Sequence, residues 1–171
     1  DVDPNTGTPT GLTASTYSNA VNIGSDTQAL ANNAIAVGTS SSVAATMVGG
    51  IALGNNAKVT GINATKGGSA SLAIGENALS TGSSEVVIGS NAGKGSTRFT
   101  GNPGDVGFAS DSALVGQSAG LNSSYIYATY LGQEAGNGSS GRHNSYVGQN
   151  AARYRDGSLN TALGSNALVG T

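Results

Sequence analysis

The chain has 171 residues, of which only 9% are charged, with a net charge of −2 at neutral pH and an isoelectric point near 5.1. This charge provides no basic surface for nucleic acid or anionic lipid, so we expect neither as a partner. The absence of cysteine excludes disulfides and thiolate metal sites. Because no apolar run approaches the ~18 residues of a membrane helix, we expect no membrane insertion by this segment, and any signal or anchor to lie outside it.

The first 19 residues contain two prolines, Pro4 and Pro9, among small polar residues and carry no repeat. We expect them to form an irregular lead-in. Asp1, Asp3 and Asn5 superficially resemble a calcium-binding loop, but its twelfth position is Leu12 where such a loop needs glutamate. We therefore predict no metal site there.

From residue 20 onward the chain repeats a short motif of a small or apolar residue, a variable residue, a large aliphatic residue and a glycine. The nine copies are Val21 to Gly24, Ile35 to Gly38, Ile51 to Gly54, Leu72 to Gly75, Val86 to Gly89, Ala113 to Gly116, Thr129 to Gly132, Ser145 to Gly148 and Thr161 to Gly164. Positions are numbered here from the motif glycine, so that minus one is the residue before it and plus one is the residue after it. We expect the aliphatic residues at minus one to form the structural core: Ile23, Val37, Leu53, Ile74, Ile88, Val115, Leu131, Val147 and Leu163.

Successive glycines of the motif lie 14, 16, 21, 14, 27, 16, 16 and 16 residues apart. A period this short holds two strands of about five residues and two turns, but no helix. We therefore predict an all-β fold, a β-solenoid of about nine coils of 14 to 16 residues that forms one domain over residues 20–171. Glycine suits the bend of each coil, and the small residue three positions later suits a narrow interior.

Residues at minus two face opposite to those at minus one, because side chains alternate along a strand. Most of them are apolar, and a strand that is apolar on both faces needs cover on both. We expect minus one to face the interior of the roll and minus two to contact other copies of the chain. The candidate contacts between copies are Val87, Leu114, Tyr130 and Tyr146.

Two intervals exceed the period, and we expect insertions near residues 59–68 and 94–111. Inserted loops of solenoids leave the coil on one face, often the binding face. The second insertion and the later turns concentrate cationic and aromatic residues. The candidate receptor-binding residues are Lys94, Arg98, Phe99, Phe108, Arg142, His143, Arg153 and Arg155. Two alternatives remain open for them, namely solvated turn residues and packing between copies, with the 94–111 loop clamping the assembly.

Motifs for catalysis or cofactor binding lack the context that they need. Gly136 to Gly141 matches a dinucleotide-binding pattern, but it lies in a turn between coils and not between a strand and a helix. His143 is the only histidine and has no nucleophile elbow nearby. The acidic residues are scattered along the chain. We expect neither an enzyme nor a cofactor.

Several repeat copies resemble the YadA-like head repeats of trimeric autotransporter adhesins. The segments that carry this resemblance are Ala34 to Gly38, Gly50 to Ala57 and Ser71 to Ala78. The later copies Tyr130 to Gly136, Asn144 to Ala151 and Asn160 to Leu168 are also similar to repeats of bacteriophage tail fibres. The resemblance covers about residues 20–171 and implies a left-handed parallel β-roll that assembles as a homotrimer.

The resemblance also implies a function, which is attachment to a glycan or protein receptor on a host. The module would be extracellular, on a bacterial cell surface or as part of a virion fibre. A structural spacer, with binding done elsewhere, is a further alternative. A virion depolymerase is the remaining one, and a glycan-cleavage assay would detect it.

Overall fold

The computed structural model describes residues 17–61, 70–82, 84–98 and 111–170. These residues form sixteen short strands, all paired in parallel, and include no helix. The expected all-β solenoid is confirmed. No helix in these ranges is long and apolar enough to cross a membrane.

Nine strands of three residues form one large sheet, and each coincides with one copy of the motif. They are β1 (Val21–Ile23), β3 (Ile35–Val37), β5 (Ile51–Leu53), β7 (Leu72–Ile74), β9 (Val86–Ile88), β11 (Ala113–Val115), β13 (Thr129–Leu131), β15 (Ser145–Val147) and β16 (Thr161–Leu163). A four-stranded sheet contains β2 (Gln28–Ala29), β4 (Ser42–Val43), β6 (Lys58–Val59) and β8 (Leu79–Ser80). A three-stranded sheet contains β10 (Thr97–Arg98), β12 (Ser124–Ile126) and β14 (Ser140–Arg142).

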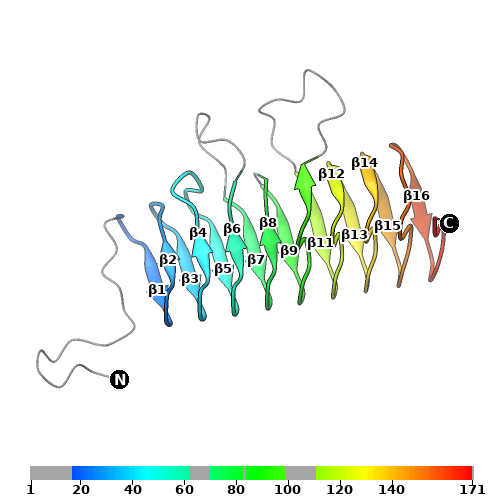
Figure 1. The fold of residues 1–171 in the computed structure, drawn as a ribbon. Coiled ribbons are helices and arrows are strands. Elements are labelled where there is room, and N and C mark those ends of the chain that lie inside the picture. The colour runs from blue at the N-terminus through cyan, green and yellow to red at the C-terminus, as the bar shows by residue number, and fades with distance from the viewer. Residues whose placement is uncertain (1–16, 62–69, 83, 99–110, 171) are drawn as a thin grey trace, which may run out of the picture.

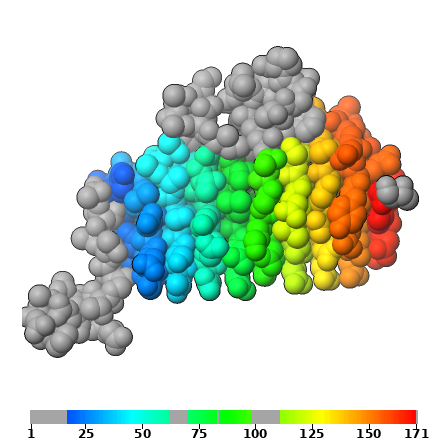
Figure 2. All heavy atoms as spheres, viewed as in Figure 1, coloured from blue at the N-terminus to red at the C-terminus, as the bar shows by residue number. Residues whose placement is uncertain are grey.

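Each turn of the chain places the next motif beside the previous one in the large sheet. Equivalent positions pair directly, as Val21 pairs with Ile35 and Tyr130 with Tyr146. The strand order therefore follows the chain, and the coils stack in sequence from one end of the molecule to the other (Figure 1). In the space-filling view the described coils appear as successive bands (Figure 2).

The motif glycine makes the bend at the end of each strand of the large sheet. At Gly132 the φ angle is 137°, and a Cβ atom there would lie 2.5 Å from the carbonyl oxygen of Gly148 in the next coil. Side chains rarely adopt such a φ angle, so both backbone conformation and space require glycine. Asparagine or serine often stands two positions later at a φ angle near 56°, as at Asn56 and Ser40.

The predicted assignment of the two strand faces is wrong. Side chains at minus two, and not those at minus one, point into the roll. The buried minus-two residues are Asn22, Ala36, Ala52, Ala73, Val87, Leu114, Tyr130, Tyr146 and Ala162. Val87, Leu114, Tyr130 and Tyr146 therefore belong to the core of a single chain and are not available for contacts between copies.

The aliphatic residues at minus one lie on the outside of the same sheet. Exposure ranges from half-buried at Val37, Leu53, Ile74 and Ile88 to 78% at Leu163. The remaining members of the predicted core, Ile23, Val115, Leu131 and Val147, are exposed. The reason is volume, because the interior of so short a coil is narrow and is filled mainly by alanine and other small residues.

The prediction of small interior residues at plus three is confirmed. Eight of the nine are buried and Ala167, near the end of the described roll, is half-buried. The interior then widens toward the C-terminal coils, where Leu114, Tyr130 and Tyr146 replace alanine at minus two. Glycine leaves space for the larger rings, since a Cβ atom at Gly136 would lie 2.5 Å from the ring of Tyr130.

The two insertions begin later than predicted. Val59 lies in β6 and pairs with Ser80, so the coil that begins with β5 continues to at least this residue. Lys94 accepts a hydrogen bond from the amide of Asn122 through its carbonyl oxygen, and Thr97 and Arg98 form β10. Residues 94–98 therefore belong to a coil. The rest of both insertions, at 62–69 and 99–110, falls outside the described residues, as does the lead-in before residue 17.

Candidate functional site

The outside of the large sheet carries aliphatic side chains along its whole length. We call it the outer face, and it consists of the residues at minus three and minus one in every coil. In the first five coils both positions are aliphatic, as in the pairs Ile35 with Val37 and Ile51 with Leu53. In the later coils minus three becomes alanine, serine or threonine, while minus one stays aliphatic. Exposed or half-buried aliphatic side chains thus run continuously over nine adjacent strands.

The outward side of the small sheets is different. Its strands present polar residues such as Gln28, Ser42, Lys58, Ser124 and Ser140 to the surroundings. A monomeric soluble protein rarely exposes a contiguous apolar patch of more than a few hundred square ångströms. Among the described residues, the outer face is therefore the more apolar of these two sides.

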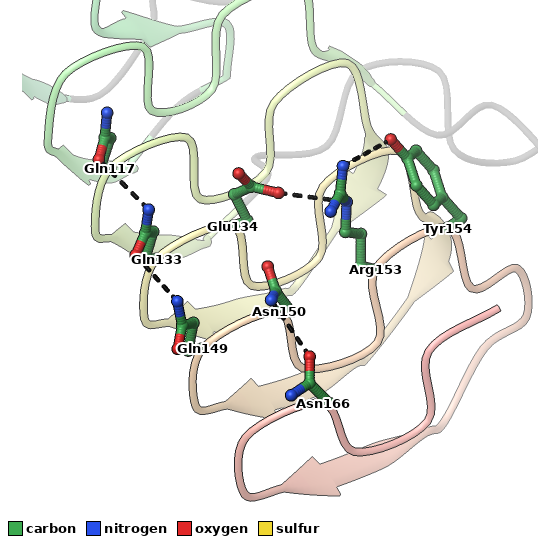
Figure 3. A network of polar contacts seen from close by, with 8 residues as sticks. All are labelled: Gln117, Gln133, Glu134, Gln149, Asn150, Arg153, Tyr154 and Asn166. Carbon is green, nitrogen blue, oxygen red and sulfur yellow. Dashed lines mark hydrogen bonds and ion pairs between the residues drawn. The ribbon is translucent and has the colours of Figure 1, made fainter.

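One edge of the outer face carries amide side chains that bind one another from coil to coil (Figure 3). Gln133 donates from Nε2 to Oε1 of Gln117 at 3.5 Å, and Gln149 donates in the same way to Gln133 at 3.2 Å. These three residues lie at plus one, directly after the motif glycine. At plus two, Asn150 donates from Nδ2 to Oδ1 of Asn166 at 3.1 Å. The ladders hold this edge in a regular arrangement.

The opposite edge carries a column of large side chains at minus five. The ring of Tyr127 stacks on that of His143, with centroids 4.8 Å apart and an angle of 18° between the planes. Leu159 follows in the next coil and is 79% exposed. Both Tyr127 and His143 have φ angles of 55°, and Leu159 has 61°. Tyrosine and leucine do not favour the left-handed region as asparagine, histidine and glycine do. Reasoning from sequence missed Tyr127 and Leu159.

A second cluster of charged and aromatic groups lies after the plus-one ladder (Figure 3). Nε of Arg153 lies 3.1 Å from Oε2 of Glu134, an ion pair without hydrogen-bond alignment. Nη2 of Arg153 also donates to the hydroxyl of Tyr154 at 3.0 Å, with the guanidinium 4.8 Å from the centre of that ring. These contacts join the coils of Gly132 and Gly148, and they leave Tyr154 56% exposed.

The candidate receptor-binding residues are not brought together at one point. Arg142 and His143 lie at the end of β14, where Arg142 is half-buried and His143 exposed. Arg155 is exposed and its carbonyl oxygen accepts a hydrogen bond from the amide of Ser140, at the start of β14. Arg153 belongs to the same turn as Arg155. The two pairs therefore flank opposite ends of one short strand in the last coils.

The other candidates lie farther along the roll or outside the described ranges. Lys94 is exposed and donates from Nζ to Oδ1 of Asn91 at 3.3 Å. Arg98 is the second residue of β10, but its side chain lies outside the described part of the structure. Phe99 and Phe108 also fall outside the described residues. Whether the 94–111 segment binds a receptor or clamps an assembly stays a prediction.

Inside the roll, a buried carboxylate takes the place of a small residue. Oε2 of Glu85 accepts hydrogen bonds from the Ser80 hydroxyl at 2.8 Å, the Thr81 amide at 3.0 Å and the Gly82 amide at 2.9 Å. Glu85 is 1% exposed and closes the short coil between β7 and β9. The arrangement satisfies donors of a tight turn, so its role is structural.

The buried tyrosines have altered acidity. Burial, reinforced by the negative charge of Glu85, raises the pKa of Tyr125 well above its ordinary value. Burial also raises the pKa of Tyr130 to about 12, against the effect of the hydrogen bond from Ser139. The pKa of Tyr146 is raised for the same reason. These groups stay protonated near neutral pH and stabilise the interior as packed rings.

Within the described ranges, no group of three or more histidine, cysteine, aspartate or glutamate residues could hold a metal ion. Comparison with protein families, with curated proteins and with solved structures gave no match for this chain.

Proposed function

We propose that the chain is an attachment module in which three copies pack together through their outer faces. The observation that carries this proposal is the uncovered aliphatic surface over all nine strands of the large sheet. Burial of such a surface is the main driving force of stable association. The number of copies and the left-handed sense of the roll are inferred from the resemblance of the repeats to trimeric autotransporter heads.

A stack of nine strands is suited to holding binding surfaces away from a particle. With strands ~4.8 Å apart, the eight intervals of the large sheet give a rod about 38 Å long. Every coil is tied to its neighbour by backbone hydrogen bonds, such as that from Gly148 N to Leu131 O at 2.8 Å. The amide ladders add side-chain bonds along one edge. These bonds make the module a stiff rod that holds its two ends at a fixed separation.

Receptor binding in this proposal is multivalent and does not involve catalysis. Each copy presents Arg142, Arg153 and Arg155 on the last coils, so an assembly repeats the same groups three times. Three weak contacts act together through effective concentration and can exceed any single affinity by orders of magnitude. The partner is a glycan or protein receptor of a host. The setting is extracellular, on a bacterial surface or a virion fibre. Both settings involve binding to a receptor of the same chemical class.

An array of glycans and matrix proteins tests the proposal when it compares the native chain with a face variant, Leu53→Asp with Val115→Asp. Both positions are on the outer face, half-buried at Leu53 and 37% exposed at Val115, so a folded single chain tolerates the charges. We expect the native chain to retain a ligand through washing and the face variant to lose it, because avidity disappears. Retention by neither protein would favour a spacer, and cleavage of a bound glycan would contradict the non-catalytic role.

A further inference from the structure

Two edges border the outer face, and their side chains change along the roll. The minus-five edge precedes each strand of the large sheet, and the plus-one edge follows its glycine. The minus-five residues are Asn19, Asn33, Gly49, Ala70, Ser84, Asp111, Tyr127, His143 and Leu159. The plus-one residues are Ser25, Thr39, Asn55, Glu76, Ser90, Gln117, Gln133, Gln149 and Ser165.

Both edges acquire long side chains in the same coils. In the coils of Gly132 and Gly148, the minus-five residues are Tyr127 and His143 and the plus-one residues are Gln133 and Gln149. In the first five coils both edges are short, with Glu76 as the exception. The outer face changes in the opposite sense there, because minus three is aliphatic in the early coils but is threonine or serine beside these long edges. Large side chains therefore lie on the face in the early coils and on its edges in the coils of Gly132 and Gly148.

Backbone conformation shows that this bulk at minus five has an energetic cost. The same column has φ angles of 59° at Asn33 and 56° at Ser84, and residues of these types occur in the left-handed region more readily than bulky ones. Tyr127 and Leu159 adopt nearly the same φ angles, where a large side chain costs roughly 1–2 kcal/mol. Strain at both Tyr127 and Leu159 points to a requirement for these side chains themselves.

We propose that, in the C-terminal coils, the minus-five edge of one copy packs against the plus-one edge of the next copy. This inference rests on the trimer of the proposed function. In a closed ring of three, each contact joins two unlike surfaces, so one edge of every copy meets the opposite edge of its neighbour. The long side chains on the two edges then fill the space between copies where the face residues have become small.

The chemistry of the two edges is complementary. Tyr127 is half-buried and His143 is exposed, and the stacked rings carry a hydroxyl and imidazole nitrogens that can form hydrogen bonds. A glutamine amide has two donors and two acceptor sites. The coil-to-coil ladder uses one donor and one acceptor site of Gln133 and one donor of Gln149. Gln133 and Gln149 therefore retain hydrogen-bonding capacity for a neighbouring copy, and Leu159 adds apolar contact at the end of the column.

Cross-linking through introduced cysteines tests the proposal, because the chain has no cysteine of its own. The double variant His143→Cys with Gln149→Cys would be treated with a short bismaleimide. Within one chain these positions are six residues apart on opposite edges of the outer face, and a link formed inside one chain would leave it at its monomer mass on the gel. We expect a covalent trimer on a denaturing gel. The single variants should give no cross-linked product, because each contact joins unlike edges.

A second pair, Tyr127→Cys with Gln133→Cys, should behave in the same way and covers the case in which the first variant fails to fold. The matched control, Ser140→Cys with Gln149→Cys, places one thiol on the polar side of the roll in the preceding strand β14 and should yield no trimer. Covalent dimers from a single variant, or no product from either double variant while the native chain is trimeric, would overturn the edge contact alone. A monomeric native chain would overturn the proposed function as well.

Discussion

Tyr130 and Tyr146 lie ring to ring inside the roll, with centroids 4.9 Å apart and planes inclined by only 5°. They occupy equivalent positions of adjacent strands, β13 and β15, so the stack follows directly from the register of the sheet. Tyr125 meets Tyr130 edge to face at 5.9 Å from the opposite wall. Three aromatic rings therefore fill the widest part of the interior.

Removing a ring from this stack should destabilise the fold strongly. For Tyr130→Ala we expect the free energy of unfolding to fall by about 3–5 kcal/mol, because the narrow roll cannot collapse around the cavity. The matched control is Tyr154→Ala, where the ring is 56% exposed and a much smaller loss is expected. Denaturant unfolding followed by circular dichroism, at one fixed protein concentration, measures both. Equal losses would show that Tyr130 is not a core residue.

High pH should reveal the same burial. A phenol whose pKa is raised on folding contributes stability that is complete below its unfolded value of about 10 and is lost as the pH rises through the folded value. For Tyr130, with a pKa of about 12, the loss reaches about 2–3 kcal/mol between these pH values. Tyr130→Phe should flatten the decline in stability. The tyrosinate absorbance of Tyr125, Tyr130 and Tyr146 should appear only above pH 10, and its full appearance near pH 10 in a folded chain would refute their burial.

The glycines of the bends and those of the turns should respond differently to substitution. Gly132→Ala should cost at least about 3 kcal/mol, since it combines an unfavourable φ angle of 137° with a clash against the backbone of Gly148. Gly138 has a φ angle of 68°, and a Cβ atom there meets only the exposed ring of Tyr154, which can turn away. We expect Gly138→Ala to cost about 1–2 kcal/mol. Thermal unfolding of the two variants compares them, and a reversed order would contradict the role of the motif glycine.

The buried carboxylate of Glu85 should matter more than its position in a turn suggests. Glu85→Ala leaves the Ser80 hydroxyl and the amides of Thr81 and Gly82 without their acceptor, which should cost more than about 2 kcal/mol. Glu85→Gln keeps one oxygen and should cost less. The exposed Glu76→Gln is the control, with an expected change within about 0.5 kcal/mol. Chemical unfolding ranks the three variants, and equal stability of all three would rule out a structural role.

Spacing predicted the coils correctly, and the physical reason is that a motif with a period near 16 residues leaves little choice of fold. Glycine at the bend and a small residue at plus three both reflect backbone and space requirements that act within one coil. Alternation along the strand also predicted two unlike faces. Alternation does not decide which face is inside. The assignment placed large aliphatic residues such as Leu53 and Leu131 in the core because of their size, and it was wrong for that reason.

Side-chain volume could have corrected that assignment. Alanine recurs at minus two in Ala36, Ala52 and Ala73, and small residues also recur at plus three, so two small columns share one narrow interior. The stacking of Tyr127 on His143 had a sequence signal too, namely bulky residues in a column that in the earlier coils holds only asparagine, glycine, alanine, serine or aspartate. The pairing of Arg153 with Glu134 had none, since it depends on how two coils meet.

Sedimentation equilibrium of the native chain and of the face variant is the most direct test of the account. We predict that the native chain has three times its 16.5 kDa chain mass, and that Leu53→Asp with Val115→Asp yields a folded single chain. The introduced carboxylates would lose their hydration without a partner at a buried contact, whereas the exposed face of a single chain accepts them. A native chain that sediments as a folded 16.5 kDa monomer at micromolar concentration would contradict assembly through the outer face.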